Sequence, residues 1–293
     1  MSLSAVRRRL DLYEKLLRLD KPIGTLLLLW PTLWALWLSA NGRPNWKIVW
    51  IFALGTLLMR SAGVAMNDFA DRNFDPHVAR TRDRPLAAGS VSAKEAWVLA
   101  AALALIAFLL ILPLGRLVIL LSVCALFLAV TYPFTKRFLA LPQAYLGVAF
   151  GFGIPMAYAA QTRGLPAITW VLLLANIFWT IAYDTEYAMV DRDDDRKIGI
   201  RTSAILFGRH DVAAVILCHA AFLGVAAGIG WWLNLAWPYY AGLLCALALA
   251  IYQYALIRNR DPQRCLRAFR DNNWVGAVVF AGIVLAYLLP RAG

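Results

Sequence analysis

Nine stretches of mostly apolar residues, each about the length of a bilayer crossing, dominate this sequence. A hydrocarbon core of about 30 Å requires a helix of about 20 apolar residues, since the backbone finds no water there to hydrogen-bond. The chain therefore predicts an all-α, polytopic membrane protein with nine transmembrane helices. The expected spans are residues 23–40, 48–66, 96–114, 117–133, 139–160, 166–183, 212–232, 237–257 and 274–290.

The composition excludes an ordinary soluble domain. Of the 293 residues, 61% are hydrophobic and 16% are charged, and the mean hydropathy is +0.63. Soluble domains carry about 25% charged residues. No polar linker separates the spans, so we expect one membrane domain over residues 1–293. The four cysteines show no metal-ligand spacing, and we expect neither a metal site nor a disulfide framework from them.

Basic residues are distributed unevenly over the two sides that nine spans define. The segments on the side of the N-terminus carry 23 Lys and Arg, and the other side carries 5. Basic loops stay in the cytoplasm, so residues 1–22 are expected to form a cytoplasmic segment. The net charge of +12 then reflects membrane orientation and not binding of nucleic acid. The five basic residues on the side opposite the N-terminus are Arg43, Lys47, Arg116, Arg163 and Arg291.

Three carboxylates and an amide follow the second span directly. On a continuing helix, Asn67, Asp71 and Asp75 recur every four residues and share one face, with Asp68 beside them. Oxygen ligands on one face suit a hard cation such as Mg²⁺, which prefers carboxylates, waters and phosphate oxygens. A solvated helix end is the alternative interpretation of this first acidic cluster.

A second acidic cluster follows the sixth span and argues against that alternative. Asp184, Asp191 and Asp195 stand at i, i+7 and i+11, again on one helical face, whereas Asp193 and Asp194 point elsewhere. So many carboxylates at a membrane surface would repel each other strongly without cations. Two facing clusters therefore predict a site for Mg²⁺ together with a polyanionic ligand, for which a diphosphate is well suited.

Cationic side chains at the same level complete the predicted site. Arg60 is the most informative, because a charge inside a span is expensive and usually faces a cavity. It precedes Asn67 by seven residues on the same helical face; snorkelling to the interface is the alternative. Further cations expected near a diphosphate or a substrate carboxylate are Arg72, Lys136, Arg137 and either Lys21 or Arg201.

These motifs together resemble the UbiA superfamily of intramembrane prenyltransferases. The paired aspartate pattern is carried by residues 67–75 and 191–195, and Tyr132 and Lys136 match the Y-x-x-x-K element of that superfamily. The runs 20–24, 183–195 and 197–203 are most similar to the bacterial branch that acts on 4-hydroxybenzoate in ubiquinone biosynthesis. The similarity extends from about residue 10 to the C-terminus.

The resemblance implies a fold, a reaction and a location. Nine transmembrane helices would surround a central cavity capped by cytoplasmic loops, in the bacterial inner membrane. The implied reaction transfers a polyprenyl chain from polyprenyl diphosphate to the ring carbon ortho to the hydroxyl of 4-hydroxybenzoate. It uses Mg²⁺ and releases diphosphate.

The resemblance also assigns roles to residues. Metal ligands would be Asp68, Asp71, Asp75, Asp191 and Asp195, of which all but Asp68 are also expected to act in catalysis together with Arg137. Arg137 is the expected partner of the benzoate carboxylate. Further residues expected to bind substrate are Asn67, Arg72, Tyr132, Lys136, Arg60 and Asp184.

Two other functions remain open at this point. A superfamily member with a different acceptor, such as a menaquinone precursor or haem, would carry the same acidic clusters. An ion-coupled membrane carrier would also place acids in a bundle, although carriers usually hold them near the middle of the membrane on broken helices. The lipid bilayer is the expected environment in each case.

Overall fold

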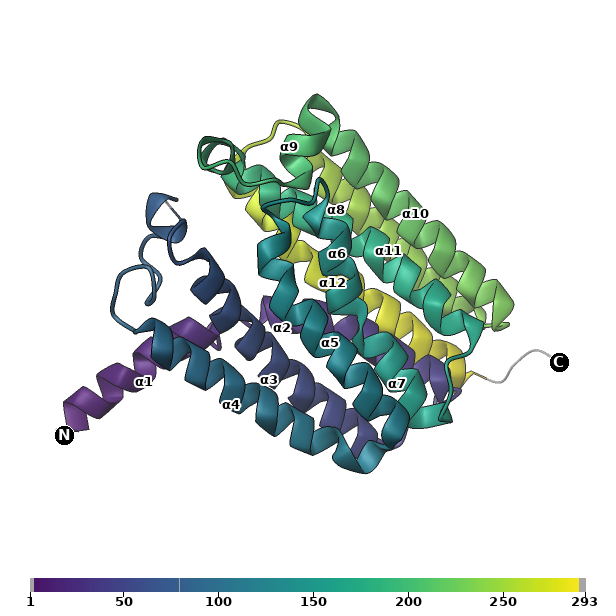
Figure 1. The fold of residues 1–293 in the computed structure, drawn as a ribbon. Helices are drawn as coiled ribbons and strands as arrows, with labels where there is room; N and C mark the ends of the chain where they lie inside the picture. Colours follow the sequence, from purple (N-terminus) through teal and green to yellow (C-terminus); the bar gives the residue numbers. More distant parts are fainter. Residues whose placement is uncertain (1–2, 79, 290–293) are drawn as a thin grey trace.

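The structure is a computed structural model that describes residues 3–78 and 80–289; Arg291 therefore lies outside the described residues. Figure 1 shows an assembly of helices with one long connection, between α3 and α4, and all regular elements of the described chain are helical. This confirms the all-α prediction. The helices are α1 (Leu3–Leu17), α2 (Ile23–Ser39), α3 (Trp46–Asp71), α4 (Ala93–Ile111), α5 (Arg116–Thr135), α6 (Pro142–Gly151), α7 (Gly153–Thr162), α8 (Ala167–Lys197), α9 (Ser203–Phe207), α10 (Asp211–Trp232), α11 (Trp237–Ile257) and α12 (Pro262–Leu288).

The predicted spans correspond to helices, although not all to long unbroken ones. Seven helical segments of the described chain are long and apolar enough to cross a membrane, and α2 is a shorter apolar helix. The remaining predicted span, residues 139–160, is divided into α6 and α7 at Phe152. A Cβ on Gly153 would lie 2.2 Å from Oγ1 of Thr32, so glycine permits the close approach of α2 at this break.

Two helices extend well beyond their predicted bounds. We expected the sixth span to end near residue 183, but α8 continues to Lys197; the ninth was expected from residue 274, but α12 begins at Pro262. Hydropathy detects only the apolar part of a helix, and both extensions are charged. The side chain of Asp261 accepts a hydrogen bond from the Arg264 backbone N–H and begins α12 as its N-cap.

Two helix starts were expected from the sequence, a capping box at residues 92–95 before the third span and Asp211 as a cap of the seventh, and their outcomes differ. Ser92 and Glu95 form the predicted capping box at the start of α4. The prediction that Asp211 caps the seventh span was wrong, because Asp211 is the first residue of α10 and His210 precedes it as N-cap. Asp211 is instead fully buried and ion-paired with Arg192 and Arg260.

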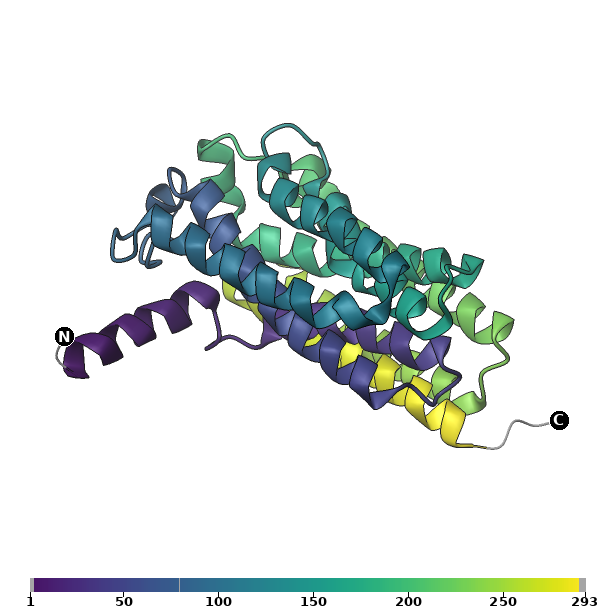
Figure 2. The ribbon, with the colours of Figure 1, turned by 60° about the horizontal axis from the view of Figure 1, so that its bottom comes forward.

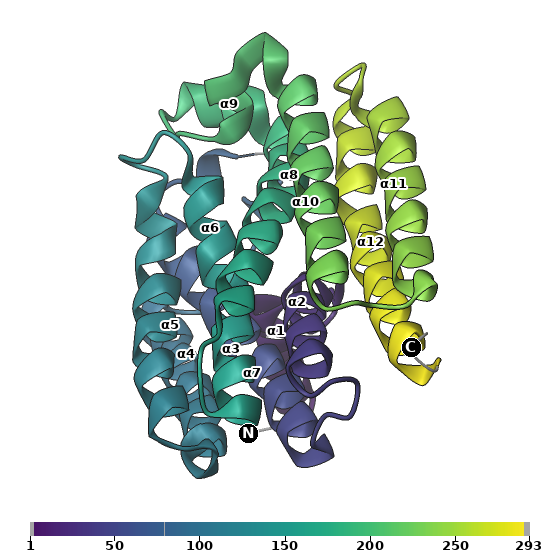
Figure 3. The same cartoon turned by 90° about the vertical axis from the view of Figure 1, so that its right-hand side faces the viewer.

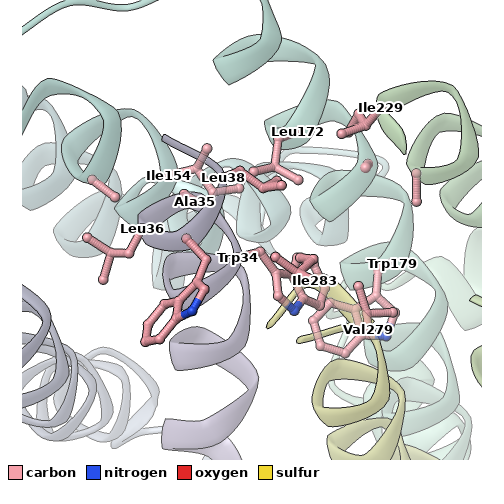
Figure 4. Close-up of a cluster of buried hydrophobic side chains, with 14 of the residues drawn as sticks. Trp34, Ala35, Leu36, Leu38, Ile154, Leu172, Trp179, Ile229, Val279 and Ile283 are labelled. Carbon is pink, nitrogen blue, oxygen red and sulfur yellow. The ribbon is translucent and has the colours of Figure 1, made fainter. Parts of the chain in front are cut away.

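Aromatic side chains join the first and last spans through α8. Trp34 packs against Trp179, with ring centroids 5.2 Å apart, and donates a hydrogen bond from Nε1 to the Gly276 carbonyl at 3.1 Å. Trp30 donates from Nε1 to Oδ1 of Asn273 on α12 at 2.9 Å. Figure 4 shows Trp34 and Trp179 within a larger buried cluster to which α7 and α10 also contribute. The bundle is thereby closed between α2 and α12.

The charged connections gather at one end of the bundle. The α3–α4 connection, the end of α8 and α9 lie together at that end, and α1 lies beside them (Figure 2). Figure 3 shows α4, α5 and α6 on one side and α10, α11 and α12 on the other, with α8 between them. Because α3 and α8 both end here, their two acidic clusters are brought to the same level.

Candidate functional site

A cavity of about 1410 Å³ lies between the helices and reaches the charged end of the bundle. Its deeper walls are apolar and come mainly from α2, α3, α4 and α5. On α4 and α5 the lining includes the apolar side chains of Leu105, Phe108 and Leu126, all of which are exposed. The cavity is therefore polar at one end and apolar along the wall that α4 and α5 form.

The first acidic cluster lines this cavity, but with a different local geometry from the one expected. Asn67 and Asp71 lie one turn apart at the end of α3, and Nδ2 of Asn67 donates to Oδ2 of Asp71 at 3.1 Å. The expectation that the same helix continues through Asp75 was wrong. Asp75 begins a short 3₁₀ turn, Asp75–His77, and Pro76 has no N–H with which the α-helix could continue. Asp75 nevertheless faces the cavity with Asp71.

Asp68 differs from its neighbours because it does not line the cavity. Its side chain is fully buried, and Oδ1 accepts hydrogen bonds from Arg18 at 2.9 Å and Arg84 at 3.0 Å. Arg84 also donates to Oδ2 of Asp75 at 2.9 Å. Burial raises the pKa of Asp75, an effect that the nearby Arg84 opposes. Guanidinium groups thus neutralise this half of the cluster.

Lys136 connects α5 to the first cluster, as its position after the fourth span suggested. Its Nζ donates to Oδ2 of Asp71 at 3.1 Å and to Oδ1 of Asn67 at 3.4 Å. Burial lowers the pKa of Lys136, but the Asp71 carboxylate more than offsets this, and the pKa lies above its ordinary value. Tyr132 also lines the cavity, with its ring centroid 5.9 Å from Nζ of Lys136.

The second acidic cluster faces the first across the cavity. Asp184, Asp191 and Asp195 share one face of α8 and all line the cavity. Arg80, from the α3–α4 connection, donates to both carboxylate oxygens of Asp191, with Nε 3.0 Å from each. The Arg80 guanidinium also lies over the ring of Tyr187, 4.6 Å from its centroid. The two clusters are therefore linked by a basic loop.

Arg60 is placed as a cavity residue. Its Nε is shielded from solvent and has no hydrogen-bond partner among the described residues. A Cβ on Gly24 would lie 2.5 Å from Nη2 of Arg60, so the guanidinium packs directly on the α2 backbone. Snorkelling to solvent does not describe this side chain, which points its charge at the cavity.

Three predicted cations lie outside the cavity lining. Arg72 donates from Nη1 to the Phe69 carbonyl at 2.8 Å, and Arg137 donates from Nη2 to the Ala70 carbonyl at 3.0 Å. Arg201 donates to the Phe138 carbonyl at 2.7 Å. Lys21, by contrast, lines the cavity. The substrate-binding roles of Arg72 and Arg137 stay predictions. Both side chains also hydrogen-bond backbone carbonyls in the last turn of α3 and so stabilise its end.

Sequence reasoning missed the basic residues that contact the acids. Arg18, Arg80 and Arg84 had been interpreted only as orientation signals, yet each forms an ion pair with a carboxylate of the site. The run of three arginines within residues 80–84, directly after the first acidic cluster, was the available signal.

The donor set fits Mg²⁺ in its chemistry. Asp71, Asp75, Asp191 and Asp195 all present hard carboxylate oxygens to one cavity, together with the amide oxygen of Asn67. Within residues 3–78 and 80–289, no three acidic, histidine or cysteine side chains converge closely enough to form a ready metal site. Asp71, Asp75 and Asp191 are instead ion-paired with Lys136, Arg84 and Arg80.

Comparison with known proteins identifies the family. A model of the UbiA prenyltransferase family matches residues 28–276. The chain belongs to this family. Among its relatives, the 4-hydroxybenzoate octaprenyltransferase of Thiobacillus denitrificans is 66% identical over 97% of each chain. The 4-hydroxybenzoate octaprenyltransferase of Dechloromonas aromatica is 63% identical over 99% of this chain and 98% of its own.

Solved structures agree with this family assignment. The apo structure of a UbiA homologue from Aeropyrum pernix superposes with a TM-score of 0.79 at 27% identity, covering 90% of this chain and 98% of that one. A UbiA homologue from Archaeoglobus fulgidus, bound to GPP and Mg²⁺, has a TM-score of 0.70 at 16% identity over 95% of this chain and 100% of its own. The second comparison supports the shared fold. Multi-pass insertion in a membrane follows from the family and from the apolar helices.

Proposed function

We propose that this UbiA-family protein transfers a polyprenyl chain from polyprenyl diphosphate to 4-hydroxybenzoate, at the ring carbon ortho to the hydroxyl, in ubiquinone biosynthesis. Full-length relatives at 62–66% identity bear the name 4-hydroxybenzoate octaprenyltransferase. The observation that carries the proposal is the cavity, in which two acidic clusters face each other at the polar end of an apolar chamber. Such a chamber accepts a diphosphate at one end and a long hydrocarbon at the other.

Mg²⁺ is the proposed cofactor, held by Asp71, Asp75, Asp191 and Asp195 with Asn67 in support. When bound, Mg²⁺ would supply positive charge that stabilises the departing diphosphate. Binding of metal and donor would release the basic side chains from these carboxylates. Asp68 is proposed as a further ligand, available once its two arginine partners move.

The released cations are proposed to bind the donor. Arg80, Arg84 and Lys136 lie at the polar end, and their guanidinium and ammonium groups suit diphosphate oxygens. The C–O bond to the diphosphate breaks with its electron pair on oxygen, and the allylic fragment becomes electron-poor. The rings of Tyr132 and Tyr187, which line the cavity, favour positive charge through their faces.

The acceptor carboxylate is proposed to bind Arg60. A buried guanidinium without a partner is expensive, and a benzoate carboxylate would supply two parallel hydrogen bonds to it. The ring carbon then attacks the allylic fragment, a C–C bond forms, and the ring proton passes to a cavity carboxylate or to the diphosphate. The earlier assignment of this carboxylate to Arg137 stays an alternative, although Arg137 is outside the cavity lining.

The proposal places both acidic clusters on the cytoplasmic side of the bacterial inner membrane. The 23-to-5 distribution of basic residues supports this orientation. The hydrocarbon of the donor would enter from the lipid along the apolar wall between α4 and α5. A second acceptor class, such as a menaquinone precursor or haem, is less well supported because the named relatives act on 4-hydroxybenzoate.

The test is a reconstituted assay that crosses acceptors with donors. Purified protein in lipid vesicles is supplied with Mg²⁺, prenyl diphosphates of several lengths, and either 4-hydroxybenzoate or other phenolic acids. We expect prenylated 4-hydroxybenzoate and released diphosphate in equal amounts. Diphosphate release without prenylated aromatic product, or a strong preference for another acceptor, would refute the proposed substrate. Ion flux without either product would instead indicate a carrier.

A further inference from the structure

Helix α1 contacts the bundle from Arg9 to its C-terminal end, and its N-terminal end extends away from the bundle (Figure 1). Leu16 is fully buried against α3 and α4. Tyr13 donates a hydrogen bond to Oε1 of Glu95 at 3.0 Å, and Arg9 pairs with the same carboxylate and donates to the Ser90 carbonyl at 2.9 Å. These contacts fix both the position of α1 and the face that it turns to the bundle.

The contacts to Glu95 place α1 at the boundary between membrane and water. Glu95 lies in the first turn of α4, which has 19 residues. At about 1.5 Å per residue, the whole of α4 is needed to cross a hydrocarbon core of about 30 Å. Trp97 and Val98 follow at once and are 54% and 51% exposed, as expected for side chains at the lipid boundary.

An apolar stripe on α1 continues beyond the part that the bundle covers. Val6, Leu10, Tyr13 and Leu17 are spaced by three or four residues and share one face. Tyr13 and Leu17 are half-buried, whereas Leu10 is 61% and Val6 39% exposed. A single exposed leucine is common on protein surfaces and indicates no binding site. An apolar stripe whose uncovered end lies at the level of the membrane surface indicates contact with lipid.

Two cations lie close to the exposed part of this stripe. Arg7 and Arg8 are exposed and belong to the N-terminal half of α1; Arg7 is next to the stripe, and Arg8 is on the opposite face of the helix. An apolar face next to arginines is the pattern of helices that lie in the plane of a membrane surface and contact anionic headgroups.

We propose that α1 binds the surface of a bilayer containing anionic phospholipid. Val6 and Leu10 enter the upper acyl region, Arg7 contacts headgroup phosphates, and Arg8, on the water-facing side, adds positive charge near the anionic surface. The chain leaves α1 directly at Arg18, whose guanidinium is 2.9 Å from Asp68. Lipid binding therefore also holds the end of α1 against the first acidic cluster.

Depth measurement by spin labelling tests this proposal on the full chain. The four cysteines are replaced by alanine, and a label is attached at Leu10→Cys or, as a matched control on the polar face, at Asp11→Cys. In nanodiscs with phosphatidylglycerol, we expect the label at position 10 to collide mainly with oxygen and the label at position 11 mainly with a water-soluble nickel chelate. Equal access of the nickel chelate to both positions would overturn the proposal.

The role of anionic lipid is tested in the same labelled protein. Oxygen access at position 10 should rise with the fraction of phosphatidylglycerol. Arg7→Gln with Arg8→Gln should reduce the equilibrium constant for the immersed state about fivefold per arginine. Arg43→Gln with Lys47→Gln, at the other end of the bundle, should leave it unchanged. Equal immersion in purely zwitterionic discs would overturn the proposal, and no readout depends on turnover.

Discussion

Replacing Arg60 by glutamine should separate activity from stability. The Arg60 Nε is shielded and has no partner among the described residues, so the folded protein bears the desolvation of an uncompensated charge. Arg60→Gln keeps a polar side chain of similar reach and removes the charge. We therefore expect the variant to be at least as stable to heat in detergent as the unsubstituted protein.

Activity should respond in the opposite direction. Losing one partner of a buried, hydrogen-bonded charge pair costs about 2–5 kcal/mol, or roughly 30- to 5,000-fold in affinity. The KM for 4-hydroxybenzoate should rise within that range, while the KM for the prenyl diphosphate changes little. The unsubstituted protein should reject 4-hydroxybenzamide, which lacks the carboxylate charge, and the variant should no longer distinguish the two.

Arg137→Ala is the matched comparison, because Arg137 is exposed and contacts a backbone carbonyl rather than the cavity. Steady-state kinetics of both variants are measured against each substrate. An unchanged acceptor KM in Arg60→Gln, together with a large rise in Arg137→Ala, would refute the reasoning. The carboxylate would then belong to Arg137.

The remaining predictions concern the acids and their orientation. Arg80→Gln should tighten binding of Mn²⁺ alone, measured by electron paramagnetic resonance, because Asp191 loses its competing cation; weaker binding would show that Arg80 does not compete. Asp71→Asn and Asp191→Asn should each lower kcat by at least about 100-fold at saturating Mg²⁺ while the protein stays folded, and activity near that of the unsubstituted protein would remove that residue from the site. Single cysteines near Ala88 and near Phe207 should be labelled only from the cytoplasmic side; labelling from opposite sides would exclude a shared site.

Features that depend on residues close together in the sequence were predictable from the sequence alone. The apolar runs predicted the helices, and the capping box predicted the start of α4 at Ser92. Spacing on one helical face predicted that Asp184, Asp191 and Asp195 line a common cavity. Each of these depends on residues within a few turns of one another, so periodicity and local hydrogen bonding suffice.

Long-range partners were not predictable in the same way. Arg80 meets Asp191 across 111 positions of the sequence, and Arg18 meets Asp68 across 50. Such pairs depend on which helices become neighbours, and a single sequence contains no periodic signal for this. For Arg137, closeness in the sequence was misleading. Its position next to Lys136 suggested that it lines the cavity, but the turn after α5 directs its side chain to the Ala70 carbonyl.

The tryptophan contacts between α2 and α12 have a consequence for biogenesis. Trp30 and Asn273 are 243 positions apart, so the helix that emerges among the first from the ribosome acquires this partner only when the last one inserts. Translation proceeds at about 5–20 residues per second, and during that interval the face of α2 that bears Trp30 and Trp34 must be covered by lipid or by the insertion machinery. A nascent chain stopped before Pro262 lacks α12 and should remain a substrate for membrane quality control. The full chain covers this face of α2 with α12 and should no longer be recognised by quality control.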